Sequence, residues 1–169
     1  MKKVDLHVHS TYSDGTNTPK ELIKLAENEG LSAIALTDHD TLDGIPNALD
    51  AAKNSSVELI PGVELSTNFN NTEVHIVGLF LDHNNKQIND YLIYQRQSRI
   101  DRNIQMCQKF CDIGINITYD KMCELYPDAV ITRAHFADYL VKNKYTGDRN
   151  EAFDRYLSPG KPCFVNRHK

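Results

Sequence analysis

Residues 1–83 alternate between two hydrophobic periods. The segment from Lys3 to His9 alternates on a period of two, which predicts a strand. A helical pattern with threonine and proline at its start and glycine at its end follows at 18–30. The series continues with an apolar run at 32–40, a helical pattern at 44–54 and another apolar run at 57–66. This alternation of strands and helices favours an α/β fold with parallel strands.

The next strand is expected to run antiparallel to the one before it. Only residues 65–72 separate Glu64 from an apolar run at 73–81. A parallel crossover needs about a dozen residues or more, so this connection is too short for one. The sequence therefore predicts that STNFNNT, at 66–72, is a hairpin loop.

The pattern changes to helix in the second half of the chain. The longest helical pattern, at 88–114, carries an apolar stripe formed by Ile93, Ile100, Ile104, Cys107 and Cys111. Shorter patterns follow at 119–126, 132–143 and 150–158. We interpret residues 1–83 as the N-terminal part of an α/β core, 84–160 as a helical insertion and 161–169 as a return toward the core.

Composition and charge narrow the class of protein. The chain has 169 residues, of which 40% are hydrophobic and 25% charged, as in a soluble globular domain. No segment approaches the roughly 18 to 20 apolar residues of a membrane span, so we expect a cytoplasmic protein. A formal net charge of −4 argues against stable binding of double-stranded nucleic acid. The cysteines lack paired spacing, which indicates reduced thiols at Cys107, Cys111, Cys123 and Cys163.

Imidazole and carboxylate side chains recur where the predicted strands end. Residues i and i+2 of a strand share a face, so His7 and His9 project together. The carboxyl ends of parallel strands meet at one edge of a sheet, and the hairpin would bring His75 back beside Glu64. Each such residue could be an ordinary turn or capping residue. Together, six of them predict a metal site: His7, His9, Asp14, His39, Glu64 and His75.

The donor types restrict the metal. Mixed imidazole and carboxylate ligands suit zinc, manganese or iron rather than calcium. A carboxylate such as Glu64 could bridge two ions. A cluster of several ions would generate hydroxide while holding a phosphoryl oxygen.

Three segments carry a family resemblance. VDLHVHSTYSDGTNTPKELIKLAENEGLSAIALTDHDTLDGI, PGVELS and VHIVGLFLD are similar to the PHP (polymerase and histidinol phosphatase) family, and the resemblance covers essentially the whole chain. It implies a distorted (β/α)7 barrel with up to three Mn, Fe or Zn ions that hydrolyses phosphoesters. Matched position by position, the six residues above correspond to metal ligands. Asp14 and His39 are implied to be catalytic as well, because in some members they lie close to the substrate.

The helical insertion suggests how a substrate is bound. Arg99 and Arg102 are three residues apart on one helix face and would present two guanidinium groups to a phosphate, unless that face is simply solvated. Arg133 and His135 follow the expected N-cap Thr132, where backbone N–H groups favour an anion, although His135 could be a packed helix residue. SRIDRN and TRAHFADYLV resemble the branch of nucleoside 3′,5′-bisphosphate phosphatases and 5′ to 3′ RNA or oligonucleotide exonucleases. The resemblance implies that these four residues bind the phosphate and sugar of a nucleotide or short oligonucleotide.

The resemblance also implies that parts of the family pattern are missing. Members of this branch have a further His ligand and a late Asp-x-His pair on later barrel strands, and His168 is not assigned to any of these roles. We therefore expect this chain to form only part of the barrel and to be weak or inactive as an enzyme on its own. A non-catalytic metal-binding or structural module is the first alternative. An amidohydrolase-type metal hydrolase is the second, although TDHD and PGVELS fit that barrel poorly.

Overall fold

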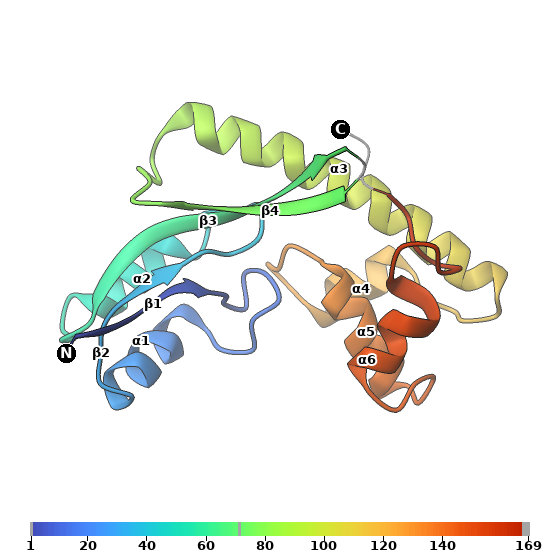
Figure 1. Ribbon diagram of the computed structural model, residues 1–169, viewed down its shortest axis with the longest axis horizontal. Coiled ribbons are helices and arrows are strands. Elements are labelled where there is room, and N and C mark those ends of the chain that lie inside the picture. The colour runs from blue at the N-terminus through green and yellow to red at the C-terminus, as the bar shows by residue number, and fades with distance from the viewer. Residues whose placement is uncertain (1, 71, 167–169) are drawn as a thin grey trace. The chain divides into compact units, whose positions relative to one another are not determined.

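The computed structural model describes residues 2–70 and 72–166, which form an α/β fold (Figure 1). The chain divides into two compact units, Met1–Arg96 and Gln97–Lys169. The boundary falls inside a long helix, α3 (Lys86–Asp112). Within the described residues, no helix combines the length and the apolar character that crossing a bilayer requires.

The first unit is built on a four-stranded sheet with the order β1-β2-β3-β4. The strands are β1 (Lys3–Val8), β2 (Leu31–Leu36), β3 (Glu58–Phe69) and β4 (Thr72–Leu79). β1, β2 and β3 are parallel, whereas β4 pairs antiparallel with β3. The predicted parallel core and the antiparallel fourth strand are therefore confirmed.

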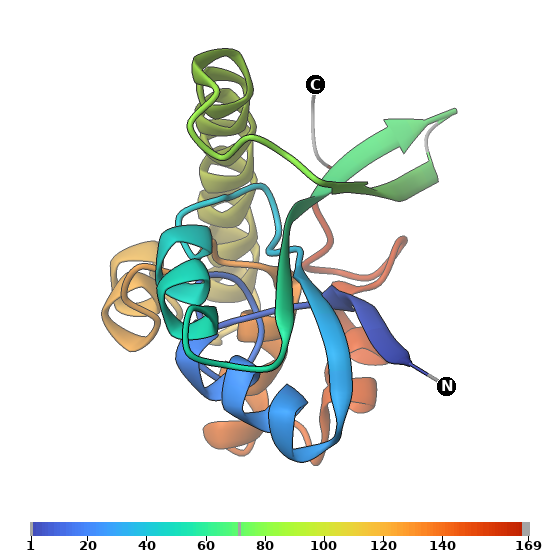
Figure 2. The same cartoon turned by 90° about the vertical axis from the view of Figure 1, so that its left-hand side faces the viewer.

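Two helices cover one face of this sheet. Helix α1 (Pro19–Asn28) begins with a capping box between Thr18 and Glu21, as the sequence indicates, and α2 (Ile45–Ala52) follows β2. Figure 2 shows both helices on the same side of β2 and β3. Apolar side chains of the two helices pack against strand residues that point toward the helices. Together they form one core, which includes Leu22, Ile23, Ile34, Leu36, Ile45, Ala48, Leu59 and Val63.

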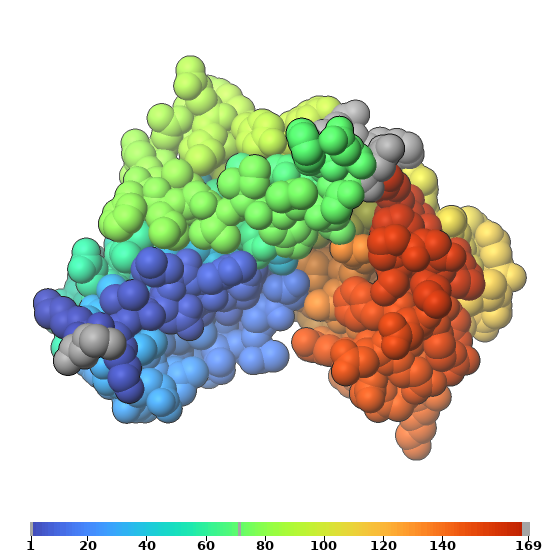
Figure 3. Space-filling model, viewed as in Figure 1, coloured from blue at the N-terminus to red at the C-terminus, as the bar shows by residue number. Residues whose placement is uncertain are grey.

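The other face of the sheet carries a small apolar cluster near its centre. Ala33, Ala35 and Ile60 form a separate buried cluster there, with Leu79 packed against it. β1 is an edge strand, and Figure 3 shows its atoms, in dark blue, open on the face in view. Val4 and Leu6 on this strand are accordingly exposed.

The β3–β4 hairpin is longer than the sequence predicts. The ladder continues through the segment 66–72, with Ser66 opposite His75 and Phe69 opposite Thr72. The prediction of a loop over this whole segment is therefore wrong. The sequence prediction fails because no apolar alternation marks this segment as strand, although the backbone ladder and a hydrogen bond from the Thr67 hydroxyl to the Val74 carbonyl at 2.7 Å pair it with β4. Asn71 lies outside the described residues.

The second unit is helical. It contains the last part of α3 together with α4 (Tyr119–Leu125), α5 (Arg133–Lys142), α6 (Arg149–Ala152) and a π-helical turn, η1 (Phe153–Leu157). Its core includes Met106, Phe110, Ile117, Met122, Phe136, Leu140 and Leu157. All four cysteines are free thiols, as predicted. His168 lies outside the described residues.

The face of α3 that is buried is not the predicted apolar stripe. Ile93 and Ile104 are 57% and 51% exposed. Of the predicted stripe, only Cys107 is buried among the described residues, and the other buried positions follow the same helical spacing on another face: Leu92, Arg99, Arg102, Asn103, Met106 and Phe110. The hydrophobic pattern misleads because three polar residues occupy this face, two of them arginines.

Candidate metal centre

Backbone pairing at the end of β2 and in β3 places two of the predicted ligands side by side. His39 forms an isolated parallel bridge with Glu64. The Glu64 N–H donates to the Asp38 carbonyl at 3.2 Å, and the Asp40 N–H donates to the Glu64 carbonyl at 3.0 Å. The strand pairing therefore continues past the end of β2 and fixes the position of His39 relative to Glu64.

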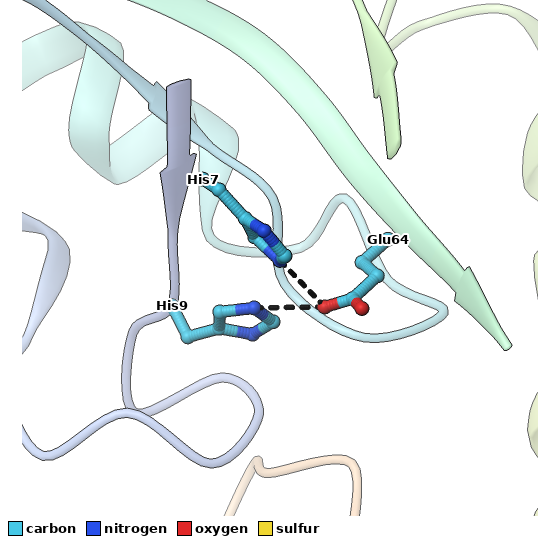
Figure 4. Close-up of side chains that lie close together, drawn as sticks. All are labelled: His7, His9 and Glu64. Carbon is cyan, nitrogen blue, oxygen red and sulfur yellow. Dashed lines mark hydrogen bonds and ion pairs between the residues drawn. The ribbon is translucent and has the colours of Figure 1, made fainter. Parts of the chain in front are cut away.

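Glu64 is the centre of the cluster. Its Oε2 lies 2.9 Å from Nε2 of His7 and 2.9 Å from Nε2 of His9 (Figure 4). Oε2 also lies 3.5 Å from Nδ1 of His39, whereas Oε1 lies 2.5 Å from Nδ1 of His75. A buried carboxylate thus faces four imidazoles: His7 lies in β1, His9 directly follows β1, His39 follows β2 and His75 lies in β4.

Asp14 lies between two of these histidines, His9 and His39. Its Oδ1 lies 3.4 Å from Nδ1 of His9, and its Oδ2 lies 3.5 Å from Nε2 of His39. The structure therefore brings all six predicted residues together. Their donor atoms form three groups, each with its atoms within 4.8 Å of one another: His7, His9 and Glu64; His9, Asp14 and His39; and His39, Glu64 and His75.

The cluster shifts the pKa of two of its members. Burial acts to raise the pKa of Glu64, but hydrogen bonds from His7 and His75 and the charge of His39 outweigh it and lower that pKa. A hydrogen bond to Glu73 is the main cause that raises the pKa of His75, and Glu64 adds to it. Histidine binds a metal ion as neutral imidazole, so an ion that binds must displace the proton from any histidine that is protonated. Metal binding should therefore weaken as the pH falls.

A buried carboxylate next to the cluster is a supporting group that the ligand pattern does not include. Asp38 accepts hydrogen bonds from the Ser10 N–H at 2.7 Å, from the Ser10 hydroxyl at 2.6 Å and from the Ser13 hydroxyl at 2.6 Å. Burial raises the pKa of Asp38, and these hydrogen bonds oppose that shift. The sequence signal for this network is weak, because serines in a loop are common and only the fold brings them to Asp38.

Gly15 closes the loop that follows β1. Its N–H donates to the Ser10 carbonyl at 3.0 Å, and a Cβ added at this position would lie 2.1 Å from the His9 carbonyl oxygen. Backbone, which cannot move aside as a flexible side chain can, occupies that space. The loop that presents Ser13 and Asp14 to His9 therefore requires glycine at position 15.

We expect Gly15→Ala to lower the free energy of unfolding of the metal-free protein by about 1 to 3 kcal/mol, the usual cost of overpacking. Metal affinity should fall as well, because the loop must move away from His9. Urea unfolding and metal titration measure the two effects. Gly78→Ala is the control, since a Cβ there meets its nearest neighbour at 3.6 Å. Similar losses in both variants would contradict this account of the loop.

The four predicted substrate-binding residues lie in the second unit. Arg99 and Arg102 are both only 4% exposed, so the alternative of a solvated helix face is wrong for them. The Arg102 guanidinium donates to Oδ1 of Asn103 at 2.8 Å. Arg133, the first residue of α5, places its guanidinium carbon 5.7 Å from the centre of the Phe164 ring.

His135 belongs to the N-terminal cap of α5. Its Nδ1 accepts a hydrogen bond from the Thr132 N–H at 2.9 Å, which completes a capping box. The ring is buried, and its centre lies 4.3 Å from that of the Tyr126 ring. Since Nδ1 accepts this hydrogen bond, the neutral ring carries its own proton on Nε2. The packed position does not by itself assign His135 to a substrate.

Comparison with known proteins identifies the family. The PHP domain profile matches residues 5–159. The chain belongs to the PHP domain family. This PHP chain is 43% identical over 164 residues to a 5′-3′ exoribonuclease of Haemophilus influenzae, covering 97% of this chain and 60% of that protein. It is 37% identical over 169 residues to a 3′,5′-nucleoside bisphosphate phosphatase of Chromobacterium violaceum, covering 98% and 59%.

A solved structure supports the same relationship. A protein from Bifidobacterium adolescentis that is considered a metal-dependent phosphoesterase matches 99% of this PHP chain and 59% of its own, with a TM-score of 0.91 and 27% sequence identity. The relatives named above are hydrolytic enzymes that act on phosphate esters. The chain spans about 60% of the length of the relatives that it matches.

Proposed function

We propose that this PHP chain is a metal-dependent phosphoesterase that hydrolyses phosphate esters of nucleotides or short oligonucleotides at a site with more than one metal ion. The observation that carries the proposal is the shared carboxylate: Glu64 belongs to two of the three donor groups. Its two oxygens face different histidines, with Oε2 toward His7 and His9 and Oε1 toward His75. A carboxylate in this position is suited to bridging two ions.

The number of free nitrogen lone pairs limits how many metal ions the histidines of the cluster could hold. A neutral imidazole has one nitrogen available as a ligand, because the other carries a proton. His9 and His39 each occur in two donor groups, so each must be committed to one ion. His7 and His9 could hold one ion with Glu64, while His39 and His75 hold a second with the same carboxylate. A third ion, as the family pattern implies, would depend on Asp14 and on further ligands.

The donor set fits manganese, iron or zinc, since all of its ligands are imidazole nitrogens or carboxylate oxygens. Such ions, when bound, supply an activated water and stabilise the charge on the phosphoryl oxygens. The residues of the chain fix where this happens. We further propose that Asp14 and His39, whose side chains lie 3.5 Å apart, contact the substrate and exchange a proton with it or with the attacking water.

The substrate class follows from the relatives and from the arginines. The Haemophilus influenzae relative is an exoribonuclease, and the Chromobacterium violaceum relative is a nucleoside bisphosphate phosphatase. We propose that Arg99, Arg102, Arg133 and His135 bind a phosphate and sugar of the substrate. Two guanidinium groups on one helix suit a dianionic phosphate, because each can donate two hydrogen bonds. The complete (β/α)7 barrel and the helical insertion at 84–160 stay predictions.

We expect the purified protein to contain Mn, Fe or Zn, and His9→Ala to contain clearly less of it, because His9 lies 2.9 Å from Glu64 in the donor group with His7. His83→Ala is the control, since His83 is absent from every donor group among the described residues. Elemental analysis measures the metal. Equal metal content in the wild type and both variants would contradict the assignment.

Turnover distinguishes the kinds of enzyme. We expect hydrolysis of para-nitrophenyl phosphate that depends on metal and on His9, and no hydrolysis of para-nitroacetanilide, an amide whose cleavage would release para-nitroaniline. We expect turnover by this chain alone to be slow. Metal content is therefore measured before turnover, because it does not depend on the rate of hydrolysis. Metal binding without any turnover would favour the non-catalytic module, and hydrolysis of the amide alone would favour an amidohydrolase.

A further inference from the structure

A hydrogen-bonded chain runs from the metal centre into the interior of the first unit. Ser10, Ser13 and Asp38 are 0%, 1% and 2% exposed. Nδ1 of His9 lies 3.2 Å from the Ser13 hydroxyl, and that hydroxyl lies 2.6 Å from Oδ1 of Asp38. This series of hydrogen bonds therefore begins at a candidate metal ligand, His9, and ends at the buried carboxylate of Asp38.

The direction of each hydrogen bond in this chain is determined by its partners. Oδ1 of Asp38 also accepts the Ser10 backbone N–H, which can only donate, at 2.7 Å. Any proton on Asp38 would sit on Oδ2, so Oδ1 acts as an acceptor in either protonation state. The Ser13 hydroxyl must therefore donate its only proton to Asp38. What it offers to His9 is a lone pair, and Nδ1 of His9 must carry the proton between them.

Asp14 points to the same tautomer. Its Oδ1 approaches His9 through Nδ1, at 3.4 Å, and an ionised carboxylate is an acceptor only. On the opposite side of the ring, Nε2 faces Oε2 of Glu64 at 2.9 Å, where a metal ligand is needed. Two independent acceptors thus lie at Nδ1, and the unprotonated nitrogen is directed at Glu64.

We propose that Ser13, oriented by Asp38, is a positioning residue that fixes His9 as the Nδ1–H tautomer and so commits His9 to the ion at His7 and Glu64. This inference rests on the proposed function, because it assigns His9 to a metal. The tautomer also assigns His9 to one of its two donor groups. With a proton on Nδ1, this nitrogen cannot bind an ion held by Asp14 and His39, so His9 binds through Nε2 in the group with His7 and Glu64. Outer hydrogen bonds of this kind orient a ligating imidazole and increase its basicity.

The tautomer can be read directly in the metal-free protein. Nitrogen-15 NMR of the neutral His9 ring distinguishes the protonated from the unprotonated nitrogen. We expect the proton on Nδ1 in the wild type. A proton on Nε2 would overturn the proposal whatever the metal does.

Two serines provide a matched pair of variants. Ser10→Ala and Ser13→Ala each remove a hydroxyl that donates to Asp38 at 2.6 Å. The Ser13 hydroxyl also meets Nδ1 of His9, whereas the Ser10 hydroxyl accepts the Tyr12 N–H at 3.1 Å. We expect Ser13→Ala to raise the fraction of His9 protonated on Nε2 and to weaken binding of Zn²⁺ by about 10- to 100-fold, as outer-shell changes do. Ser10→Ala should keep the wild-type tautomer and an affinity close to that of the wild type.

The outcomes separate this inference from the proposed function. Equal weakening by the two variants would overturn the positioning role, because it would show only the loss of a buried hydrogen bond. An unchanged tautomer and an unchanged affinity in Ser13→Ala would overturn it as well. If Zn²⁺ binds to none of the proteins while His9 carries its proton on Nδ1, the hydrogen-bond assignment is supported and the proposed metal function is refuted.

Discussion

Replacing Glu64 with glutamine should remove most of the metal from the purified protein and weaken metal binding by more than about 100-fold, the upper end of the effect of outer-shell changes. The amide has the size of the carboxylate but lacks its charge, and its NH₂ group would point a donor at a ligand nitrogen. Glu64 contacts His7, His9 and His75 at 2.9 Å or less. Because the carboxylate is shared, both donor groups that contain it should fail together.

Stoichiometry makes this prediction specific. His7→Ala affects one donor group and should remove one ion, whereas Glu64→Gln affects two and should remove both. Elemental analysis after dialysis measures the difference. Glu58→Gln, an exposed position on the same strand β3, is the control and should retain the wild-type metal content. A Glu64→Gln protein that loses no more metal than His7→Ala would contradict the bridging role.

Removing the Arg99 guanidinium should weaken action on a nucleoside 3′,5′-bisphosphate by roughly tenfold to a hundredfold, which corresponds to the 1.5 to 3 kcal/mol of a hydrogen bond to a charged group. Arg99→Lys tests this with the least disturbance, because lysine keeps the charge at this buried position and loses only the planar fork. Hydrolysis of para-nitrophenyl phosphate, which lacks a second phosphate, should change much less, and metal content should not change.

The control for this experiment is an arginine of the second unit with an exposed ion pair. Arg155 lies in η1 and bonds to Glu151 at 2.7 Å, so Arg155→Lys should leave both substrates unaffected. Equal losses on the two substrates in Arg99→Lys would show that Arg99 supports the fold or the chemistry rather than the binding of a second phosphate.

The local pattern of the chain predicts the order and the direction of the strands and helices of the first unit, although not the length of the β3–β4 hairpin. Thr18, Pro19 and Glu21 are signals for the start of a helix that act within a single turn, and α1 begins where they indicate. The short connection after Glu64 excludes a crossover on length alone, and β4 is antiparallel. Such predictions succeed because sterics and backbone hydrogen bonds over a few residues determine them.

Predictions that depend on burial were less successful. The stripe with Ile93 and Ile104 has the period of an amphipathic helix, but α3 buries a different face, with Arg99, Arg102 and Asn103 on it. A hydrophobic period identifies the buried face only when the neighbours of the helix are apolar. Buried polar residues that find partners in three dimensions leave no periodic signal along the chain.

For the candidate centre, the sequence by itself determined the ligand types and the strand ends from which they project, because a period of two and the polarity of parallel strands place His7 and His9 without any knowledge of packing. Only the tertiary structure decided that Glu64 stands between His7, His9 and His75, with its two oxygens facing different histidines. It also decided that Asp38 supports His9 through Ser13. Those contacts join segments far apart in the chain, and the direction of a hydrogen bond depends on the full set of partners around each atom, which only the folded chain assembles.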